Sequence, residues 1–107
     1  METKENNFMK KKHPEKAVHL TPGGKTRIVV KYDCGFSNTL YIRGSGANLN
    51  WNKGQKLQNV ARDEWVWETS APFKECEFKV LLNDVNYEVG ENHHLTSGMA
   101  IQYTPKF

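Results

Sequence analysis

With 107 residues, the chain is long enough for one small domain, whose modest core leaves no room for a large enclosed active-site cavity. Hydrophobic residues make up 37% of the sequence, and since no apolar run approaches the roughly 18 residues of a transmembrane helix, we expect no membrane span. The formal net charge of +3 lies within residues 1–25, whereas basic and acidic residues balance from Thr26 onward, which argues against a basic nucleic-acid-binding face on the folded part.

Residues 1–25 predict a flexible basic leader. They are polar and charged, and they end in the turn signal Pro22-Gly23-Gly24. The basic run at 10–13 could contact phosphate groups or a membrane surface; the alternative is that it only keeps the leader solvated. Because the N-terminus lacks the apolar core of a secretory signal peptide, we expect a cytoplasmic protein in which Cys34 and Cys76 are free thiols.

The rest of the sequence consists of short segments in which apolar and polar residues alternate. In one of them, Cys76, Phe78 and Val80 fall on one side of an extended chain, and Glu77 and Lys79 on the other. The strands expected on this basis lie at 27–33, 39–43, 55–60, 64–69, 75–82, 85–89 and 99–103. About seven short strands separated by turns predict an all-β fold, a small antiparallel β-sandwich of the immunoglobulin-like type at 26–107.

The tryptophans divide into two groups. Trp65 and Trp67 point the same way from one expected strand, so we assign both to the core. Trp51 instead stands in a loop of Asn, Lys and Gly residues. An aromatic side chain flanked by polar residues is typical of a binding surface, so we interpret Trp51 as part of one.

Polar and aromatic residues also converge at the turn signal Asn83-Asp84. The strands at 75–82 and 85–89 would form a hairpin about this turn. One end of that hairpin would then bring together a cation, an aromatic ring, a carboxylate and an amide, which are Lys79, Tyr87, Glu88 and Asn92. An ordinary solvated surface is the alternative, but an aromatic ring among such polar groups favours a binding site.

The sequence offers little for catalysis. It contains no H-E-x-x-H, C-x-x-C or G-x-S-x-G motif, and Gly44-Ser45-Gly46 is not followed by the helical pattern that a phosphate-binding loop requires. His93 and His94 point to opposite faces of a strand, so they could share a metal only from an irregular loop that also used Glu91. Glu88 and Glu91 would need a substrate-sized cleft to act as a glycosidase pair. We therefore predict no enzyme activity, no catalytic residue, no metal site and no cofactor.

A sugar ligand suits these residues better than a reaction. A hexose presents a flat patch of C–H groups, on which an aromatic ring stacks, and a rim of hydroxyls. Amides and charged groups suit that rim because each can bond two neighbouring hydroxyls. Trp51 and Tyr87 supply the rings, and the polar groups come from Lys79, Glu88 and Asn92.

Five segments, in this order and spacing, make the chain from about Thr26 to the C-terminus resemble a known family. They are Leu40-Tyr41-Ile42-Arg43-Gly44-Ser45, Leu49-Asn50-Trp51, Glu64-Trp65, Glu77-Phe78-Lys79 and Tyr87-Glu88-Val89-Gly90-Glu91-Asn92-His93. The set resembles the starch-binding domains of carbohydrate-binding module family 20 and their glycogen-binding relatives in family 48. The second segment is similar to the family's leucine–glycine–aspartate–tryptophan motif, and the fourth to its glutamate–tyrosine–lysine motif. The last is similar to its tryptophan–glutamate–x–glycine–x–asparagine–arginine motif.

The resemblance implies a non-catalytic module that binds α-1,4-glucan, either as a starch or glycogen polysaccharide or as a maltooligosaccharide. It implies that Trp51 and Tyr87 are the two sugar platforms. It also implies that Lys79 and Asn92 bond glucose hydroxyls, and we expect Glu88, from its place in the hairpin, to join them in the polar rim. The family usually accompanies a starch- or glycogen-metabolising enzyme, so such an enzyme is the expected protein partner.

The sequence departs from the family pattern at several positions. Tyr87 replaces a tryptophan and His93 an arginine, and 60–63 lacks the tyrosines of the family's second binding site, so we expect one site. The alternative hypothesis is a regulatory protein-interaction module that keeps the fold but has lost sugar binding. A third hypothesis is nucleic-acid binding through the basic leader and the exposed rings.

Overall fold

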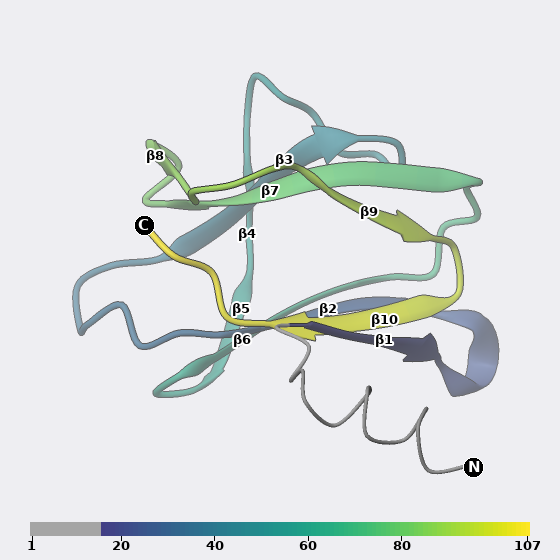
Figure 1. Cartoon of the computed structure of the whole chain (residues 1–107), viewed down its shortest axis with the longest axis horizontal. Helices are drawn as coiled ribbons and strands as arrows, with labels where there is room; N and C mark the ends of the chain where they lie inside the picture. Colours follow the sequence, from purple (N-terminus) through teal and green to yellow (C-terminus); the bar gives the residue numbers. More distant parts are fainter. Residues whose placement is uncertain (1–15) are drawn as a thin grey trace, which may run out of the picture.

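Two β-sheets packed face to face form the fold in the computed structural model, which describes residues 16–107 (Figure 1). Sheet A, the lower layer of Figure 1, contains in spatial order β1 (Lys16–Leu20), β10 (Met99–Tyr103), β2 (Thr26–Lys31), β6 (Glu64–Thr69) and β5 (Gln58–Ala61). Sheet B contains β4 (Gln55–Lys56), β3 (Leu40–Ser45), β7 (Glu75–Leu82) and β8 (Asn86–Tyr87), and β9 (His93–Thr96) also pairs with β7. The predicted all-β sandwich is confirmed.

The strand pairing differs from the prediction in two respects. Residues 16–107 contain ten strands instead of about seven, because β1 and β9 were not predicted and the predicted strand at 55–60 is divided into β4 and β5. In addition, β10 pairs with β2 in parallel, from Ala100↔Arg27 to Tyr103↔Val30, so the sandwich is not wholly antiparallel. Alternation of apolar residues predicts that a segment is a strand, but it does not specify the partner or direction of that strand.

The predicted leader does not coincide with the start of the folded part. Residues 16–20 form β1, which pairs antiparallel with β10, and η1 (Pro22–Gly24), a 3-10 turn, connects β1 to β2. The side chains of Val18 and Leu20 remain 49% and 74% exposed, so backbone hydrogen bonds rather than apolar burial hold this edge strand. The basic run at 10–13 lies outside the described residues.

The core lies between the sheets and contains both of the tryptophans assigned to it. Trp65 is 6% exposed and Trp67 is 7% exposed. Their indole N–H groups donate to the backbone carbonyl of Tyr32 (3.2 Å) and to the side-chain oxygen of Gln55 (3.0 Å). The prediction for these two residues is confirmed. Within the part of the chain that is described, no helix is both long and apolar enough to cross a bilayer.

The two cysteines should differ strongly in reactivity. Both are free thiols, as predicted, but Cys76 is 1% exposed in the core whereas Cys34 is partly exposed. Burial raises the pKa of Cys76 to about 11, so that at pH 8 only about one molecule in a thousand carries the reactive thiolate. We expect Ellman's reagent to label Cys34 in the folded protein and Cys76 only after denaturation. Equal labelling rates in a Cys34→Ser and a Cys76→Ser variant would contradict this assignment.

Candidate functional site

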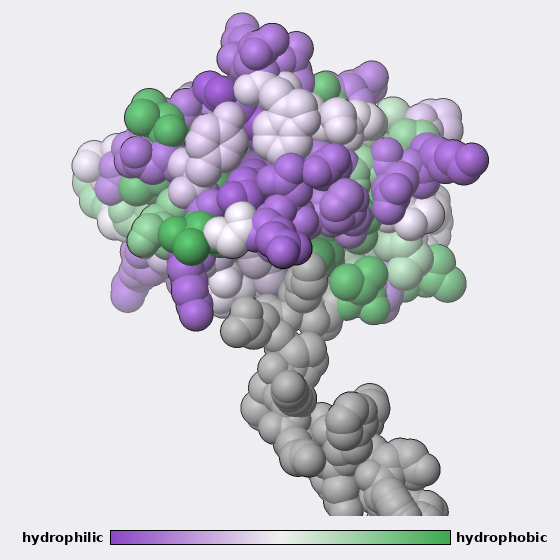
Figure 2. Space-filling view, turned by 45° about the horizontal axis from the view of Figure 1, so that its top comes forward, coloured by the Kyte–Doolittle hydropathy of each residue, from purple (hydrophilic) through white to green (hydrophobic). Residues whose placement is uncertain are grey.

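The outer face of sheet B carries four of the five residues that the sequence assigned to the site. β3 and β7 pair antiparallel, so that Arg43 lies opposite Lys79 and Tyr41 opposite Leu81. Since their neighbours in each strand point into the core, these four share the surface that faces away from sheet A. Leu81 is nonetheless fully buried, because Tyr41 flanks it on β3 and Tyr87 on β8. Figure 2 brings this side forward and shows residues of intermediate hydropathy among hydrophilic ones.

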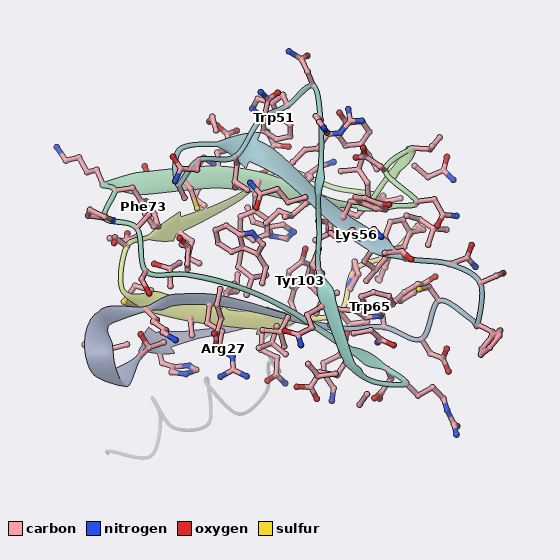
Figure 3. All side chains as sticks on the ribbon, turned by 180° about the vertical axis from the view of Figure 1, so that it is seen from behind. Arg27, Trp51, Lys56, Trp65, Phe73 and Tyr103 are labelled. Atoms are coloured by element: carbon pink, nitrogen blue, oxygen red, sulfur yellow. The ribbon has the colours of Figure 1, made fainter. Side chains whose placement is uncertain are left out.

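The loop between β3 and β4 holds Trp51 on this face. The loop leaves β3 through Gly46, whose φ of 82° favours glycine. The side-chain oxygen of Asn50 then accepts a hydrogen bond from the N–H of Asn52 (2.6 Å), which tightens the backbone around Trp51. Figure 3 shows Trp51 on the outer side of sheet B, whereas Tyr103 lies between the layers. The indole is partly exposed, so Trp51 is not a core residue.

The glycines of the Gly44-Ser45-Gly46 segment have a steric role. A Cβ atom at Gly44 would collide with the backbone carbonyl of Glu77, and one at Gly46 would lie 2.5 Å from the carbonyl oxygen of Glu75. The end of β3 therefore lies directly against β7, with no space for a side chain between the two backbones. This close approach fixes the point at which the Trp51 loop leaves the sheet.

Arg43 connects the separate segments of the face. Its Nε donates to Oδ1 of Asp84 (2.8 Å), and its Nη2 donates to the Asp84 carbonyl (3.1 Å). Its Nη1 donates to the carbonyl of Trp51 (3.0 Å) and to the hydroxyl oxygen of Tyr87 (3.4 Å). The side-chain hydrogen bond between Arg43 and Asp84 lowers the pKa of Asp84 and raises the pKa of Arg43. Both groups are therefore charged at neutral pH.

The turn between β7 and β8 places Tyr87 in the site. Asn83 and Asp84 form this turn with φ of 56° and 57°, a left-handed conformation that Asn and Asp adopt more readily than other side-chain-bearing residues. β8 then returns along β7 with Tyr87 opposite Leu81. Tyr87 is 45% exposed, so its ring is open to a ligand while Arg43 holds its hydroxyl.

Lys79 and Asn92 are held on the same face by neighbouring acceptors. The ammonium of Lys79 donates to the backbone carbonyl of Glu88 (2.9 Å), and the amide nitrogen of Asn92 donates to Oε2 of Glu77 (2.7 Å). Each bond uses one donor, whereas an ammonium has three and a primary amide has two donors and an acceptor. The structure thus brings four of the five predicted residues, including Trp51, to the outer face of sheet B.

The fifth predicted residue, Glu88, points the other way. It is 3% exposed, and its Oε2 accepts hydrogen bonds from the N–H of Val80 (2.7 Å) and the hydroxyl of Tyr103 (2.7 Å). Its Oε1 lies 3.0 Å from Nε2 of His93. The carboxylate therefore ties β7 to β10 inside the sandwich and does not reach the outer face. Successive residues of an extended chain face opposite ways, so Tyr87 and Glu88 cannot both face a ligand there.

Two residues of the site, Arg43 and Asp84, were absent from the sequence-based assignment. They are separated by 41 positions, so no local pattern connects them. The alternation of side chains along β3 could have revealed Arg43, because residues two positions apart face the same side and Arg43 therefore shares its side of the strand with Tyr41. Once β3 was paired with β7, the register would have placed Arg43 directly opposite Lys79.

One surface pocket lies beside the site residue Asn92, and another lies beside the core residue Trp65. The first, of about 410 Å³, lies between segments 88–93 and 103–106. The second, of about 430 Å³, has a lining that includes the fully exposed ring of Phe36. Among residues 16–107, no three His, Cys, Asp or Glu side chains gather as a set of metal ligands.

Comparison with known proteins shows the fold. No protein-family model matches the chain, and no curated protein matches its sequence. The structure is similar to a solved one. This is the glycoside hydrolase family 15 glucoamylase from Hypocrea jecorina, with a TM-score of 0.63 and 18% sequence identity. The similarity covers 90% of this chain but only 18% of the glucoamylase chain, so it concerns a small part of that enzyme.

Proposed function

We propose that this protein binds α-1,4-glucans, as starch, glycogen or maltooligosaccharides, without cleaving them. The observation that carries the proposal is the pair of aromatic residues on the outer face of sheet B, Trp51 and Tyr87, which hydrogen-bond to one nitrogen of Arg43. The ordered sequence resemblance to starch-binding domains supports it. The fold similarity to part of a glucoamylase supports a link to carbohydrate.

In this proposal the two rings stack on adjacent glucose units, which an α-linked chain presents along a curve. Lys79 and Asn92 bond the hydroxyls at the rim with the donors that their protein contacts leave over. Glu88 contributes its backbone carbonyl, which positions Lys79, and not its carboxylate. A shallow open site of this kind gives affinities in the range from about micromolar to millimolar, or roughly 4–8 kcal/mol.

The carboxylates near this face support binding without hydrolysis. Glycoside hydrolysis requires two carboxyl groups that flank the scissile bond, one of them as a proton donor. Here the carboxylate of Asp84 is paired with Arg43, that of Glu77 accepts from Asn92, and that of Glu88 is buried.

The direct test is a titration with maltoheptaose and β-cyclodextrin, followed by tryptophan fluorescence and by amide NMR shifts. We expect saturable shifts that cluster at Trp51, Lys79, Tyr87 and Asn92. Cellohexaose, a straight β-linked chain, serves as the control and should produce none. The affinity should be nearly independent of salt, whereas a nucleic-acid ligand would lose affinity steeply as salt is raised. If nothing responds at about 10 mM ligand, the regulatory protein-interaction module becomes the better hypothesis.

The number of sites is a separate expectation. Phe36 is 105% exposed, so unlike Tyr87 it has no partner that holds its ring in place, and the neighbouring Trp65 is only 6% exposed. A ring that must be ordered by the ligand contributes less to binding. We therefore expect calorimetry with maltoheptaose to give one site per chain, and Phe36→Ala to leave both stoichiometry and affinity unchanged. A drop from two sites to one in Phe36→Ala would overturn the single-site prediction.

A further inference from the structure

The Arg43–Asp84 pair is the feature of the site that neither the sequence motifs nor the proposed sugar contacts explain. It joins three parts of the chain: the middle of β3, the loop between β3 and β4, and the turn between β7 and β8. We propose that Arg43 and Asp84 are positioning residues that fix Trp51 and Tyr87 in the glucan-binding arrangement before the ligand arrives. This inference rests on the proposed function.

The contacts of the pair hold the Trp51 loop at two points. Arg43 binds the carbonyl of Trp51, and Oδ2 of Asp84 accepts from the N–H of Gly54 (3.3 Å) at the far side of the loop. A side chain at Gly54 would collide with the Asp84 carboxylate, so the loop backbone lies directly against this group. The position of the loop is therefore set by the Asp84 carboxylate as well as by the arginine.

The same guanidinium also orients Tyr87. Its Nη1 donates to the Tyr87 hydroxyl at 3.4 Å, and its central carbon lies 5.9 Å from the ring centre, within the range of a cation–π contact. A tyrosine without such contacts would rotate freely about its side-chain torsions in solvent. The ligand would then have to order the Tyr87 side chain, and the free energy this costs would weaken binding. Contacts with Arg43 order the ring beforehand and avoid that loss.

The placement of Arg43 argues for a role beyond sheet stability. Arg43 lies directly opposite Lys79 in the β3–β7 pairing, and like charges in that position destabilise a sheet. Asp84 compensates for one of the two positive charges. A neutral β-branched residue at position 43 would serve the sheet better, whereas only a planar group with several donors can bind Asp84, Trp51 and Tyr87 together.

Four variants test this inference in the full chain. Arg43→Met removes the charge and the donors, Arg43→Lys keeps only the charge, and Asp84→Asn keeps the shape and the tolerance for a left-handed φ. Arg27→Lys is the matched control, because Arg27 pairs with Glu68 (3.3 Å) on the outer face of sheet A, far from the site. Each variant is titrated with maltoheptaose, and its melting temperature and ligand-free amide spectrum are recorded.

We expect Arg43→Met and Asp84→Asn each to weaken binding about tenfold, the effect of leaving one or two side chains to be ordered by the ligand. Arg43→Lys should recover little of this loss, and Arg27→Lys should bind like the wild type. Melting temperatures should fall by about 4 °C or less, because this ion pair lies at the surface with 19% and 25% of its side-chain area exposed, and surface pairs add only modest stability. The ligand-free amide shifts of Trp51, Gly54 and Tyr87 should change in the site variants.

Three outcomes would overturn the inference while leaving the proposed function in place. If the wild type binds and Arg43→Met binds equally well, Arg43 positions nothing and the proposed function stands without it. If Arg43→Lys binds like the wild type, charge alone is sufficient. If Asp84→Asn keeps full affinity while Arg43→Met loses it, Arg43 contacts the sugar directly. Absence of wild-type binding at about 10 mM overturns the proposed function, and this inference with it.

Discussion

Replacing Trp51 by alanine should weaken binding of maltoheptaose by roughly 70-fold. The estimate takes a stacked ring face of roughly 100 Å² at about 25 cal/mol per Å², which amounts to about 2.5 kcal/mol. A Kd of about 1 μM would then become about 70 μM, whereas a site near 1 mM would no longer saturate at about 10 mM ligand. Calorimetry or the amide titration described above would measure the change.

The fold of the Trp51→Ala variant should be unaffected. The indole lies on the outer side of sheet B, and Arg43 binds the backbone carbonyl of Trp51, which alanine retains. The control is Trp65→Ala, which removes a core ring that is 6% exposed and should destabilise the protein by about 3–5 kcal/mol. If Trp51→Ala unfolds in the same way as Trp65→Ala, Trp51 is structural and the site is misplaced.

Replacing Glu88 by alanine should lower the free energy of unfolding by about 3 kcal/mol, because it leaves buried polar groups without their acceptor. These groups are the N–H of Val80 and the hydroxyl of Tyr103, which both donate to Oε2, and the His93 ring that lies against Oε1. Urea denaturation would measure the loss. Tyr103→Phe is the partial counterpart, since it removes one hydrogen bond of the same network, and it should lose about 1 kcal/mol.

The variant Glu88→Gln separates a structural role from a ligand contact. If Glu88 acts as the structure indicates, Glu88→Gln is less stable but binds maltoheptaose normally at temperatures where it is folded. A variant with unchanged stability and lost binding would instead place the carboxylate in the sugar site, as the sequence-based assignment predicted. Only the second result would require the side chain of Glu88 to leave the interior.

The same network predicts the alkaline limit of stability. Burial, followed by the nearby Glu88 carboxylate, raises the pKa of Tyr103 well above its usual value. The folded protein therefore keeps the hydroxyl protonated at a pH where the unfolded chain loses it. This contribution is fully present below a pH of about 10, the pKa of tyrosine in an unfolded chain, and it is lost as pH rises beyond that value.

The sequence predicted what depends on local alternation and missed what depends on pairing across the sheet. The burial of Trp65 and Trp67 and the sandwich itself followed from the period of apolar residues along each strand. Glu88 was misjudged because it was grouped with the polar residues at one end of the expected hairpin, although that same period turns it away from its neighbour Tyr87. Arg43 was missed because its partner Asp84 becomes a neighbour only through the β3–β7 pairing. Strand β1 was missed because it lies within the charged and polar segment predicted to be a leader, and its Val18 and Leu20 side chains stay exposed.

The position of β10 has a consequence for how the chain folds as it is synthesised. β10 covers Met99–Tyr103, yet it lies inside sheet A between β1 and β2. Until the ribosome has released those residues, β2 presents a bare hydrogen-bonding edge, and such an edge readily pairs with other chains. The Glu88 carboxylate likewise has no Tyr103 hydroxyl to accept from. Closure of sheet A must therefore follow translation of residue 103, so this order of strands delays completion of the fold to the last part of the described chain.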